Sequence, residues 1–377
     1  MAVRILHVHS TFTLGGKEAR AVRLMNAFGA RAQHTIISTV AGALDARAAI
    51  AENIAVAFPD EHPTFIGKPS IGRYLAIARY LRNFDLILTY NWGAMDAVGA
   101  HRLFARALKL PPLIHHEDGF NQDEAERQKP ARVWFRRAVL GTAHALVVPS
   151  HTLERIALTS WRQPNARVHR IANGIPLDRY GSVAPEPATA NELVVVGTIA
   201  GLRAVKNLPR LVRAFAASGI RGRLRIIGEG PERSAILQAA AELGIADRLD
   251  LPGFNPDPAA ALRDIDIFAL SSDSEQQPIS LIEAMASGLP VVSTDVGDVR
   301  EMVSDENSSL IVPAAHEKLF AEALSKMAAN MSDRVAIGAA NRAKALQIFD
   351  EKTMVDRYRA LYEAAMGQQG ALAGDTR

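Results

Sequence analysis

The chain of 377 residues alternates ten short apolar runs, rich in β-branched residues, with longer helical patterns. Strands that alternate with helices form parallel sheets, because the helical connections must cover both faces. Ten strands exceed one ordinary doubly wound sheet, so the sequence predicts an α/β protein with two such sheets. A (β/α)8 barrel is the main competitor at this length. The runs occupy residues 5–10, 34–40, 85–90, 111–116, 145–150, 192–198, 224–229, 249–254, 266–271 and 290–295.

A break near the middle of the chain favours two domains over a barrel. Residues 181–192 read GSVAPEPATANE, which is rich in Pro, Ala and small polar residues, and a new strand is predicted at Leu193. We place the linker there. The 48% apolar and 22% charged composition is typical of a globular protein with well-packed cores. We expect one domain over residues 1–176 and a second over 177–352.

Near the C-terminus, apolar residues recur at helical spacing and predict a helix over about 353–367. They are Met354, Tyr358, Leu361 and Tyr362. From the residues alone, this is also compatible with one more helix of the second domain. Residues 368–377 are small and polar, and they are predicted to form a flexible tail.

Composition limits the environment of the protein. Without cysteine the chain can form no disulfide and no thiolate metal site, which fits a reducing cytoplasm. The N-terminal MAVRILHVHS turns polar too early for a signal peptide, and no run approaches the roughly 18 apolar residues of a membrane span. We expect a cytoplasmic protein, with any membrane association peripheral at the inner face of the cell membrane.

Charge is distributed unevenly between the two halves. Residues 1–176 contain 22 Lys and Arg against 13 Asp and Glu, net +9, whereas residues 177–377 contain 21 against 27, net −6. The basic residues are scattered without a zinc-finger, basic-zipper or RNP pattern, so nucleic acid is not the expected partner. An anionic membrane or a lipid pyrophosphate acceptor fits the basic half better.

Residues 274–298 read SEQQPISLIEAMASGLPVVSTDVGD and place two carboxylates at a defined spacing. Pro278 is tolerated in a first helical turn, so a helix is predicted to begin near it and to end before Gly288. Glu275 then lies on the preceding loop and Glu283 inside the helix. At the rise of a helix, the two carboxylates are roughly 10 Å apart. That distance suits the span from ribose to hexose in a sugar nucleotide.

The first turn of this helix, at Ile279 and Ser280, has free N–H groups that favour an anion such as a diphosphate. The segment resembles the glutamate-pair signature of glycosyltransferase family 4, whose members are retaining and use nucleotide sugars. The resemblance implies that Glu275 contacts the donor hexose hydroxyls and that Glu283 contacts the nucleotide ribose. Gln276 stands where the family usually has Gly, next to the expected donor-sugar contacts.

The resemblance extends over residues 3–366 and includes the run EAMASGLPVVSTDVGDVREMV. It implies the GT-B fold, in which two Rossmann-like doubly wound domains face each other across a cleft. The N-terminal domain would hold the acceptor, the C-terminal domain would hold the nucleotide sugar, and the last helix would cross back onto the N-terminal domain. No metal is required in this family.

Arg203 and Lys206 lie on a loop that leaves the strand at 192–198, just before a helix. Ligands of open α/β sheets bind beyond the carboxyl ends of strands, and guanidinium and ammonium groups suit phosphate oxygens. Such a pair can also simply face solvent. The resemblance implies that it grips the donor diphosphate and offsets charge on the leaving nucleotide. The spacing departs from the family's commoner Arg-x4-Lys.

Gly15 and Gly16 follow the first strand and let the backbone approach a ligand where a helix begins near Lys17. A glycine pair in such a loop is most often only a turn. Here it matches the GG-x-E loop that, in family 4, closes over the donor phosphates and borders the acceptor.

Two further loops, LTYNWGAMDAV (88–98) and LIHHEDGF (113–120), resemble the acceptor side of members that build bacterial exopolysaccharide. Many members carry a His after the second of these strands, facing the reacting sugar. We favour His116 for that catalytic role. The other acceptor-side candidates, two of which compete with it, are Asn91, Trp92, His115 and Asp118.

The predicted helix PARVWFRRAVL (130–140) mixes three arginines with Trp134 and Phe135. Basic and aromatic residues together suit a helix that lies in a membrane interface. The alternative is that the aromatic rings belong to the core and the arginines are solvated. The residues that would contact lipid phosphates are Arg132, Arg136 and Arg137.

We expect a retaining glycosyltransferase that moves a hexose from a UDP- or GDP-linked sugar to a glycan, lipid-linked or small-molecule acceptor in cell-surface polysaccharide synthesis. In the mechanism that the family implies, the departing phosphate helps to deprotonate the acceptor, and Arg203 and Lys206 stabilise the transition state. The alternatives are a nucleotide-sugar epimerase of the same fold and, if Gln276 has spoiled the site, a non-catalytic nucleotide-sugar-binding subunit.

A metal site at the adjacent residues 115–118 is a further interpretation, because imidazole and carboxylate are good ligands. Adjacent residues rarely converge on one ion without partners elsewhere in the fold. We therefore expect no metal and no other cofactor.

Overall fold

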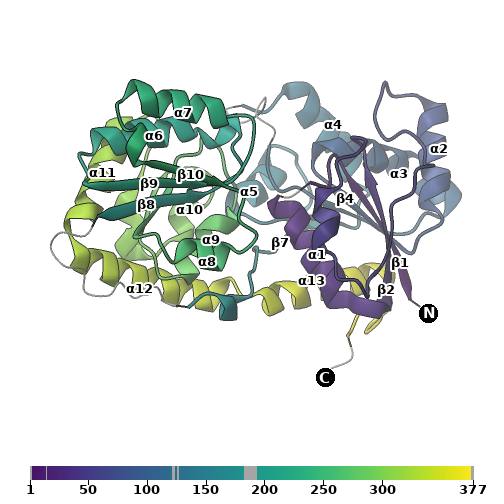
Figure 1. The fold of residues 1–377 in the computed structure, drawn as a ribbon. Helices are drawn as coiled ribbons and strands as arrows, with labels where there is room; N and C mark the ends of the chain where they lie inside the picture. Colours follow the sequence, from purple (N-terminus) through teal and green to yellow (C-terminus); the bar gives the residue numbers. More distant parts are fainter. Residues whose placement is uncertain (1, 14, 121–123, 125–126, 182–192, 375–377) are drawn as a thin grey trace. The chain divides into compact units, whose positions relative to one another are not determined.

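The computed structural model describes residues 2–13, 15–120, 124, 127–181 and 193–374. The chain divides into two compact units, which Figure 1 shows in colours that follow the sequence. Unit 1 comprises Met1–Ala172 and Thr353–Arg377, and unit 2 comprises Asn173–Lys352. The predicted linker, apart from Gly181, lies outside the described residues.

Unit 1 is built on a seven-stranded parallel sheet in the order β3-β2-β1-β4-β5-β6-β7. Residues of the interior strand at 3–9 enter different cores: Val3 and Ile5 pack on one side of the sheet, and Leu6 and Val8 pack on the other. Both faces are therefore buried, as the apolar runs predict. The strands are β1 (Val3–His9), β2 (Ala32–Ser38), β3 (Ala55–Ala57), β4 (Leu86–Tyr90), β5 (Leu113–His116), β6 (Ala145–Val148) and β7 (Val168–Arg170).

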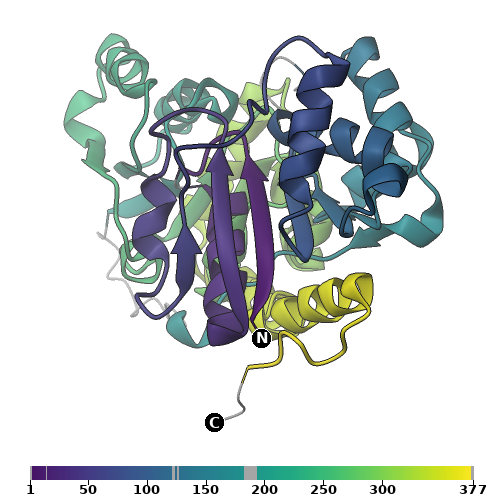
Figure 2. The same ribbon diagram turned by 90° about the vertical axis from the view of Figure 1, so that its right-hand side faces the viewer.

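Helices cover both faces of this sheet. The core on one side is closed by α1 and α13, and the core on the other side by α2, α3, α4 and α5. Figure 2 shows β1 and β2 side by side, with the blue helices α2 and α3 to their right. The bounds are α1 (Gly16–Phe28), α2 (Ile71–Leu81), α3 (Met95–Leu108), α4 (Pro130–Leu140), α5 (His151–Thr159) and α13 (Glu351–Met366).

The C-terminal segment packs against unit 1. Tyr358 and Tyr362 of α13 are fully buried in the same core as α1. After the helix, the N–H groups of Gly370 and Leu372 donate to the Glu363 carboxylate at 2.9 and 2.8 Å, and the Leu372 side chain is fully buried. Residues 368–374 thus form a packed turn, which differs from the predicted flexible tail because a buried carboxylate and a buried leucine fix the turn.

Unit 2 is built on a six-stranded parallel sheet in the order β10-β9-β8-β11-β12-β13. One face is covered by α6, α7 and α11, and α9 packs against β11, β12 and α12. The strands are β8 (Val194–Ile199), β9 (Gly222–Ile227), β10 (Leu249–Gly253), β11 (Ile267–Leu270), β12 (Val291–Thr294) and β13 (Ile311–Val312). The helices are α6 (Leu208–Ala217), α7 (Arg233–Glu242), α8 (Pro258–Leu262), α9 (Ile279–Ala286), α10 (Val299–Met302), α11 (Glu317–Ala329) and α12 (Met331–Ile348).

All ten predicted strands are present, and the prediction of two parallel α/β sheets is confirmed. A (β/α)8 barrel is excluded because the strands form two open sheets. The sequence did not reveal β3, β7 and β13, which are three residues long or shorter and lie at sheet edges. Short edge strands bury little apolar surface, so they leave no hydrophobic run to recognise.

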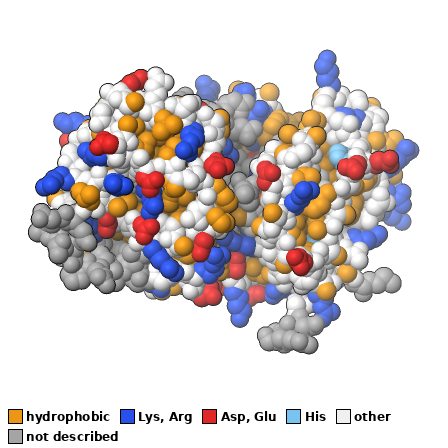
Figure 3. Space-filling view, in the orientation of Figure 1, with side chains coloured by type: hydrophobic (Ala, Val, Ile, Leu, Met, Phe, Trp, Pro, Cys, Tyr) orange, Lys and Arg blue, Asp and Glu red, His pale blue; other side chains and the backbone are white. Residues whose placement is uncertain are grey.

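The surface in Figure 3 carries basic and acidic side chains interspersed, with apolar side chains between them. The unequal charge of the two halves of the sequence is therefore not visible on this face as a surface of one sign. Within the described ranges, no helix combines the length and the apolar character needed to cross a bilayer.

Candidate active site

In each unit the strand order reverses at one place, and all the predicted site loops except the one after β5 lie there. In unit 2 the reversal falls between β8 and β11, whose loops carry Arg203 and Glu275. In unit 1 it falls between β1 and β4, whose loops carry Gly15 and Asn91. Loops at such a switch point diverge above the carboxyl ends of the strands and leave room for a ligand.

The two switch-point loops of unit 2 are joined by an ion pair. The Lys206 ammonium lies 2.5 Å from Glu275 Oε1, and the Ser272 hydroxyl donates to the same oxygen at 2.7 Å. The Lys206 and Glu275 side chains are only 17% and 11% exposed, so the pair is partly withdrawn from water. The fold thus brings together two candidate catalytic residues that are 69 positions apart.

Arg203 lies beside this pair in sequence but is exposed. It precedes a short 3-10 helix, Ala204–Lys206, and its guanidinium has no ion pair or side-chain hydrogen bond with any described residue. A guanidinium in this state can offer its full fork of donors to phosphate oxygens.

Helix α9 begins at Ile279, with Pro278 as its N-cap, as the sequence predicts. Ile279 and Ser280 belong to its first turn, where N–H groups have no intrahelical acceptor. Glu283 lies on the same helix, is 6% exposed and accepts a hydrogen bond from the Tyr180 hydroxyl at 3.1 Å. The carboxylate is therefore held inside unit 2.

Sequence reasoning missed the glycine loop that supports the Arg203 loop. The Leu202 N–H donates to the Glu229 carbonyl at 2.8 Å, which ties the loop after β8 to the loop after β9. A Cβ at Gly228 would lie 1.9 Å from the Ala200 carbonyl oxygen, and one at Gly230 would lie 2.4 Å from that of Leu202. Both glycines have positive φ, so the GEGPE sequence was the available signal.

In unit 1, Gly15 is the N-cap of α1, and Gly16 is its first residue. A Cβ on Gly15 would lie 2.8 Å from the Glu18 carboxylate, so the glycine makes room for that side chain. Glu18 forms an ion pair with Lys17, whose ammonium also donates to the Thr11 carbonyl at 3.2 Å. The GG-x-E segment therefore forms a compact polar turn above β1.

The structure brings together Asn91 and Asp118, two of the predicted acceptor-side residues. The Asp118 N–H donates to Asn91 Oδ1 at 2.7 Å, and the Asp118 carboxylate pairs with the buried Arg20 guanidinium, with Nη2 and Oδ2 at 2.8 Å. Asn91 has a φ of 54° and a ψ of −171°, a backbone conformation that is strained for any residue other than glycine. Trp92 follows, with Arg132 and Arg136 over its ring at 4.8 and 5.0 Å.

His116, by contrast, is an interior residue. Its ring is 1% exposed, Nε2 lies 2.9 Å from the Tyr362 hydroxyl, and Nδ1 lies 3.2 Å from the Thr89 carbonyl oxygen. His115 is fully buried against the Thr89 hydroxyl. This placement differs from the prediction that His116 faces the reacting sugar. The reason is that both histidines end β5, a central strand covered on both faces; Asp118 is the first partly exposed residue after it.

One of the three predicted membrane-facing arginines of α4 is buried and the other two are half-buried. Arg136 is fully buried, with Nε 3.2 Å from Glu117, and the Arg132 guanidinium lies 2.9 Å from Glu124. Trp134 instead is 67% exposed, with Arg137 over its ring at 5.1 Å. Both interpretations of this helix are therefore wrong in part, since an arginine lies in the core and an aromatic ring lies in solvent.

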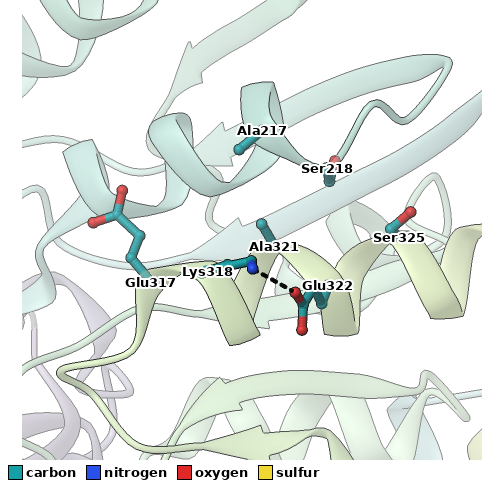
Figure 4. Close-up of a pocket in the computed structure, with 7 residues that line it drawn as sticks. All are labelled: Ala217, Ser218, Glu317, Lys318, Ala321, Glu322 and Ser325. Carbon is teal, nitrogen blue, oxygen red and sulfur yellow. Dashed lines mark ion pairs between the residues drawn. The ribbon is translucent and has the colours of Figure 1, made fainter.

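A separate hollow of about 520 Å³ lies between α6 and α11. Figure 4 shows its lining, with the Lys318–Glu322 ion pair at 3.8 Å. It includes Ala217 and Ser218 at the far end of α6 from the Lys206 loop, so it does not belong to the switch-point site. Among the residues that the structure describes, no three His, Asp or Glu side chains are grouped to hold a metal ion.

Comparison with known proteins decides the family. A family model described as Glycosyltransferase Family 4 matches residues 14–179, and one described as Glycosyl transferases group 1 matches residues 190–330. The D-inositol 3-phosphate glycosyltransferase of Saccharomonospora viridis is 31% identical over 310 residues, covering 75% of this chain and 70% of that protein. This chain belongs to glycosyltransferase family 4. It is therefore an enzyme, a glycosyltransferase.

Other relatives have lower sequence identity to this chain. EpsF of Bacillus subtilis, named as a glycosyltransferase, is 26% identical over 321 residues, covering 78% of this chain and 79% of EpsF. WcaL of Escherichia coli, named as a colanic acid biosynthesis glycosyltransferase, is 26% identical over 238 residues. That alignment covers 60% of this chain and 57% of WcaL, so the chain matches little more than half of WcaL.

Solved structures identify the fold. Anabaena HepE in complex with UDP has a TM-score of 0.77 at 18% identity, covering 96% of this chain and all of that chain. The sucrose-phosphate synthase of Thermosynechococcus elongatus has a TM-score of 0.76 at 18% identity, covering 97% and 99% of the two chains. The predicted GT-B fold of two Rossmann-like units is thereby confirmed.

The buried histidines of unit 1 should make this family 4 protein sensitive to mild acid. Burial lowers the pKa of His34 to about 4 and holds the pKa values of His7, His9 and His116 well below the usual value. Histidines of the unfolded chain take up protons near pH 6.5, whereas the four buried histidines of the folded protein stay neutral at that pH. The free energy of unfolding should therefore fall from about pH 7 to about pH 5, by up to about 1.4 kcal/mol per pH unit for each histidine.

Urea unfolding followed by tryptophan fluorescence measures this effect, because all three tryptophans lie in unit 1. Hydrogen exchange in β8 and β9 provides an internal control, since the only histidine in the sequence of unit 2 is the exposed His316. A constant stability of unit 1 across this pH range would contradict the neutral, buried state of the histidines.

Proposed function

We propose that this chain is a retaining glycosyltransferase that transfers a hexose from a nucleoside-diphosphate sugar. The observation that carries the proposal is the convergence of Lys206 and Glu275 at the switch point of unit 2, with Glu283 on the helix that follows. A cation, a hydroxyl-binding carboxylate and a helix N-terminus are the groups that a diphosphate sugar requires. HepE, with the same fold, was solved with UDP and with UDP-glucose, which supports a donor of this class.

In this proposal Arg203 and Lys206 bind the diphosphate, Ile279 and Ser280 donate backbone N–H groups to it, and Glu283 binds the ribose. Glu275 orients the hexose hydroxyls. The basic pair stabilises the negative charge that grows on the leaving nucleotide, and the departing phosphate oxygen accepts the proton of the acceptor hydroxyl on the same face of the sugar. Neither step is assigned to a metal ion.

We assign the acceptor side to unit 1, at the compact turn of Gly15 and Gly16 and at Asn91 and Asp118. Asp118 is held by Arg20 and by Asn91, so its carboxylate is pre-organised to accept a hydrogen bond from a sugar hydroxyl. The acceptor is a glycan, a lipid-linked sugar or a small molecule. The name of WcaL, a colanic acid biosynthesis glycosyltransferase, supports a role in polysaccharide synthesis, which we place in the cytoplasm as part of this proposal.

The basic pair should discriminate between diphosphate and nucleoside. The double substitution Arg203→Ala and Lys206→Ala removes two charge-assisted contacts, so affinity for UDP or GDP should fall about 100-fold, while affinity for free uridine or guanosine changes less than about threefold. Calorimetry measures both. Arg213→Ala, which removes an exposed arginine of α6, is the matched control. Equal losses for both ligands would show that the pair is not the diphosphate site.

The two glutamates should separate catalysis from binding. Glu275→Gln should lower kcat by about 100-fold or more with little effect on the Kd of the nucleoside diphosphate, because hexose placement sets the direction of attack. Glu283→Gln should raise that Kd and the donor KM, because a ribose contact is made in both ground and transition states. Steady-state kinetics with thermal melts measures this, and exposed Glu322→Gln is the control. Unchanged kcat in folded Glu275→Gln would exclude the proposed hexose contact.

Contact with an anionic membrane, if the acceptor is lipid-linked, would use the exposed Trp134 and Leu103, which are 67% and 58% exposed on α4 and α3. Arg102 joins these helices through the Ala138 carbonyl at 3.3 Å. Trp134→Gln should therefore reduce binding to phosphatidylglycerol vesicles at low salt, whereas Leu237→Gln on α7 should not. If the wild-type protein does not bind these vesicles, the proposed membrane contact is wrong.

A further inference from the structure

Glu283 is held by a tyrosine that comes from a distant part of the sequence. The Tyr180 hydroxyl donates to Glu283 Oε1 at 3.1 Å across 103 sequence positions, and the two residues are 2% and 6% exposed. A hydrogen bond to one oxygen of a buried carboxylate restricts the rotation of that carboxylate. The tyrosine hydroxyl therefore favours one orientation of the Glu283 side chain.

Tyr180 is itself fixed against the helix that carries Glu283. Arg342 of α12 donates to the Tyr180 carbonyl oxygen at 2.6 Å and also to the carbonyl of Ala286, the last residue of α9. The tyrosine thus contacts α9 in two ways: its hydroxyl binds Glu283, and its backbone is joined through Arg342 to the end of the helix. The segment at Tyr180 and the two helices α9 and α12 therefore form a single hydrogen-bonded unit.

We propose that Tyr180 is a positioning residue for nucleoside recognition, which holds the Glu283 carboxylate in the orientation that accepts the two ribose hydroxyls. The proposal rests on the proposed function, in which Glu283 contacts the ribose. It adds a residue that touches no substrate and acts through Glu283. Because the hydroxyl is the group that makes the contact, phenylalanine at this position keeps the packing and removes only the orientation of the carboxylate.

Tyr180→Phe tests this inference. Affinity for UDP or GDP, whichever the wild type binds more tightly, should fall about tenfold, and affinity for inorganic pyrophosphate should not change, because the loss concerns the nucleoside end. Donor KM should rise with kcat nearly constant. Tyr74→Phe is the matched control, since it removes a tyrosine hydroxyl that donates to the Asp96 carboxylate at 2.9 Å in unit 1. It should leave nucleotide binding unchanged.

The double variant Tyr180→Phe and Glu283→Gln separates the possible outcomes. If the tyrosine acts through the carboxylate, the double variant should bind the nucleotide no more weakly than Glu283→Gln alone. Unchanged or tighter binding by Tyr180→Phe, with weaker binding by Glu283→Gln, would overturn the positioning role and leave the proposed function intact. If Glu283→Gln itself binds normally, the ribose contact fails and the inference fails with it. Thermal melts establish that each variant is folded.

Discussion

Parallel strands determine where the chemistry of this protein can lie. Neighbouring parallel strands need a crossover connection, so all their carboxyl ends meet at one edge of the sheet, and helices bury both faces. Each of the two sheets has one place where successive crossovers run in opposite directions. It lies between β1 and β4 in unit 1 and between β8 and β11 in unit 2. Every predicted site loop except the one after β5 follows one of these four strands, and β5 pairs with β4.

One of the two cations of the proposed diphosphate site is already paired within unit 2. Lys206 is paired with Glu275, whereas Arg203 has no side-chain partner among the described residues. A diphosphate that reached this loop would meet Arg203 first and would compete with Glu275 for Lys206. Freed from the ammonium, the Glu275 carboxylate would be available to hexose hydroxyls, so diphosphate binding and hexose placement are expected to be coupled.

Unit 1 buries two arginines, although charged side chains usually lie at the protein surface. Arg20 and Arg136 are both buried, and each is compensated: Arg20 by Asp118, and Arg136 by Glu117 together with the rings of Trp92 and Trp161. Removing one partner would leave an unpaired buried charge, which is costly. These pairs also fix the loop after β5, so the position of Asp118, the proposed acceptor-side carboxylate, depends on its contact with the buried Arg20.

The sequence by itself determined the ten main strands and their two parallel sheets, the start of α9 directly after Pro278, and the family. Those properties depend on local patterns: apolar runs, a proline-rich break and motif spacing. Only the tertiary structure decided that His116 is interior, that Arg136 is buried while Trp134 is exposed, and that Tyr180 reaches Glu283. The physical reason is that burial and pairing depend on residues far away in the chain, and a single sequence does not report which distant residues meet.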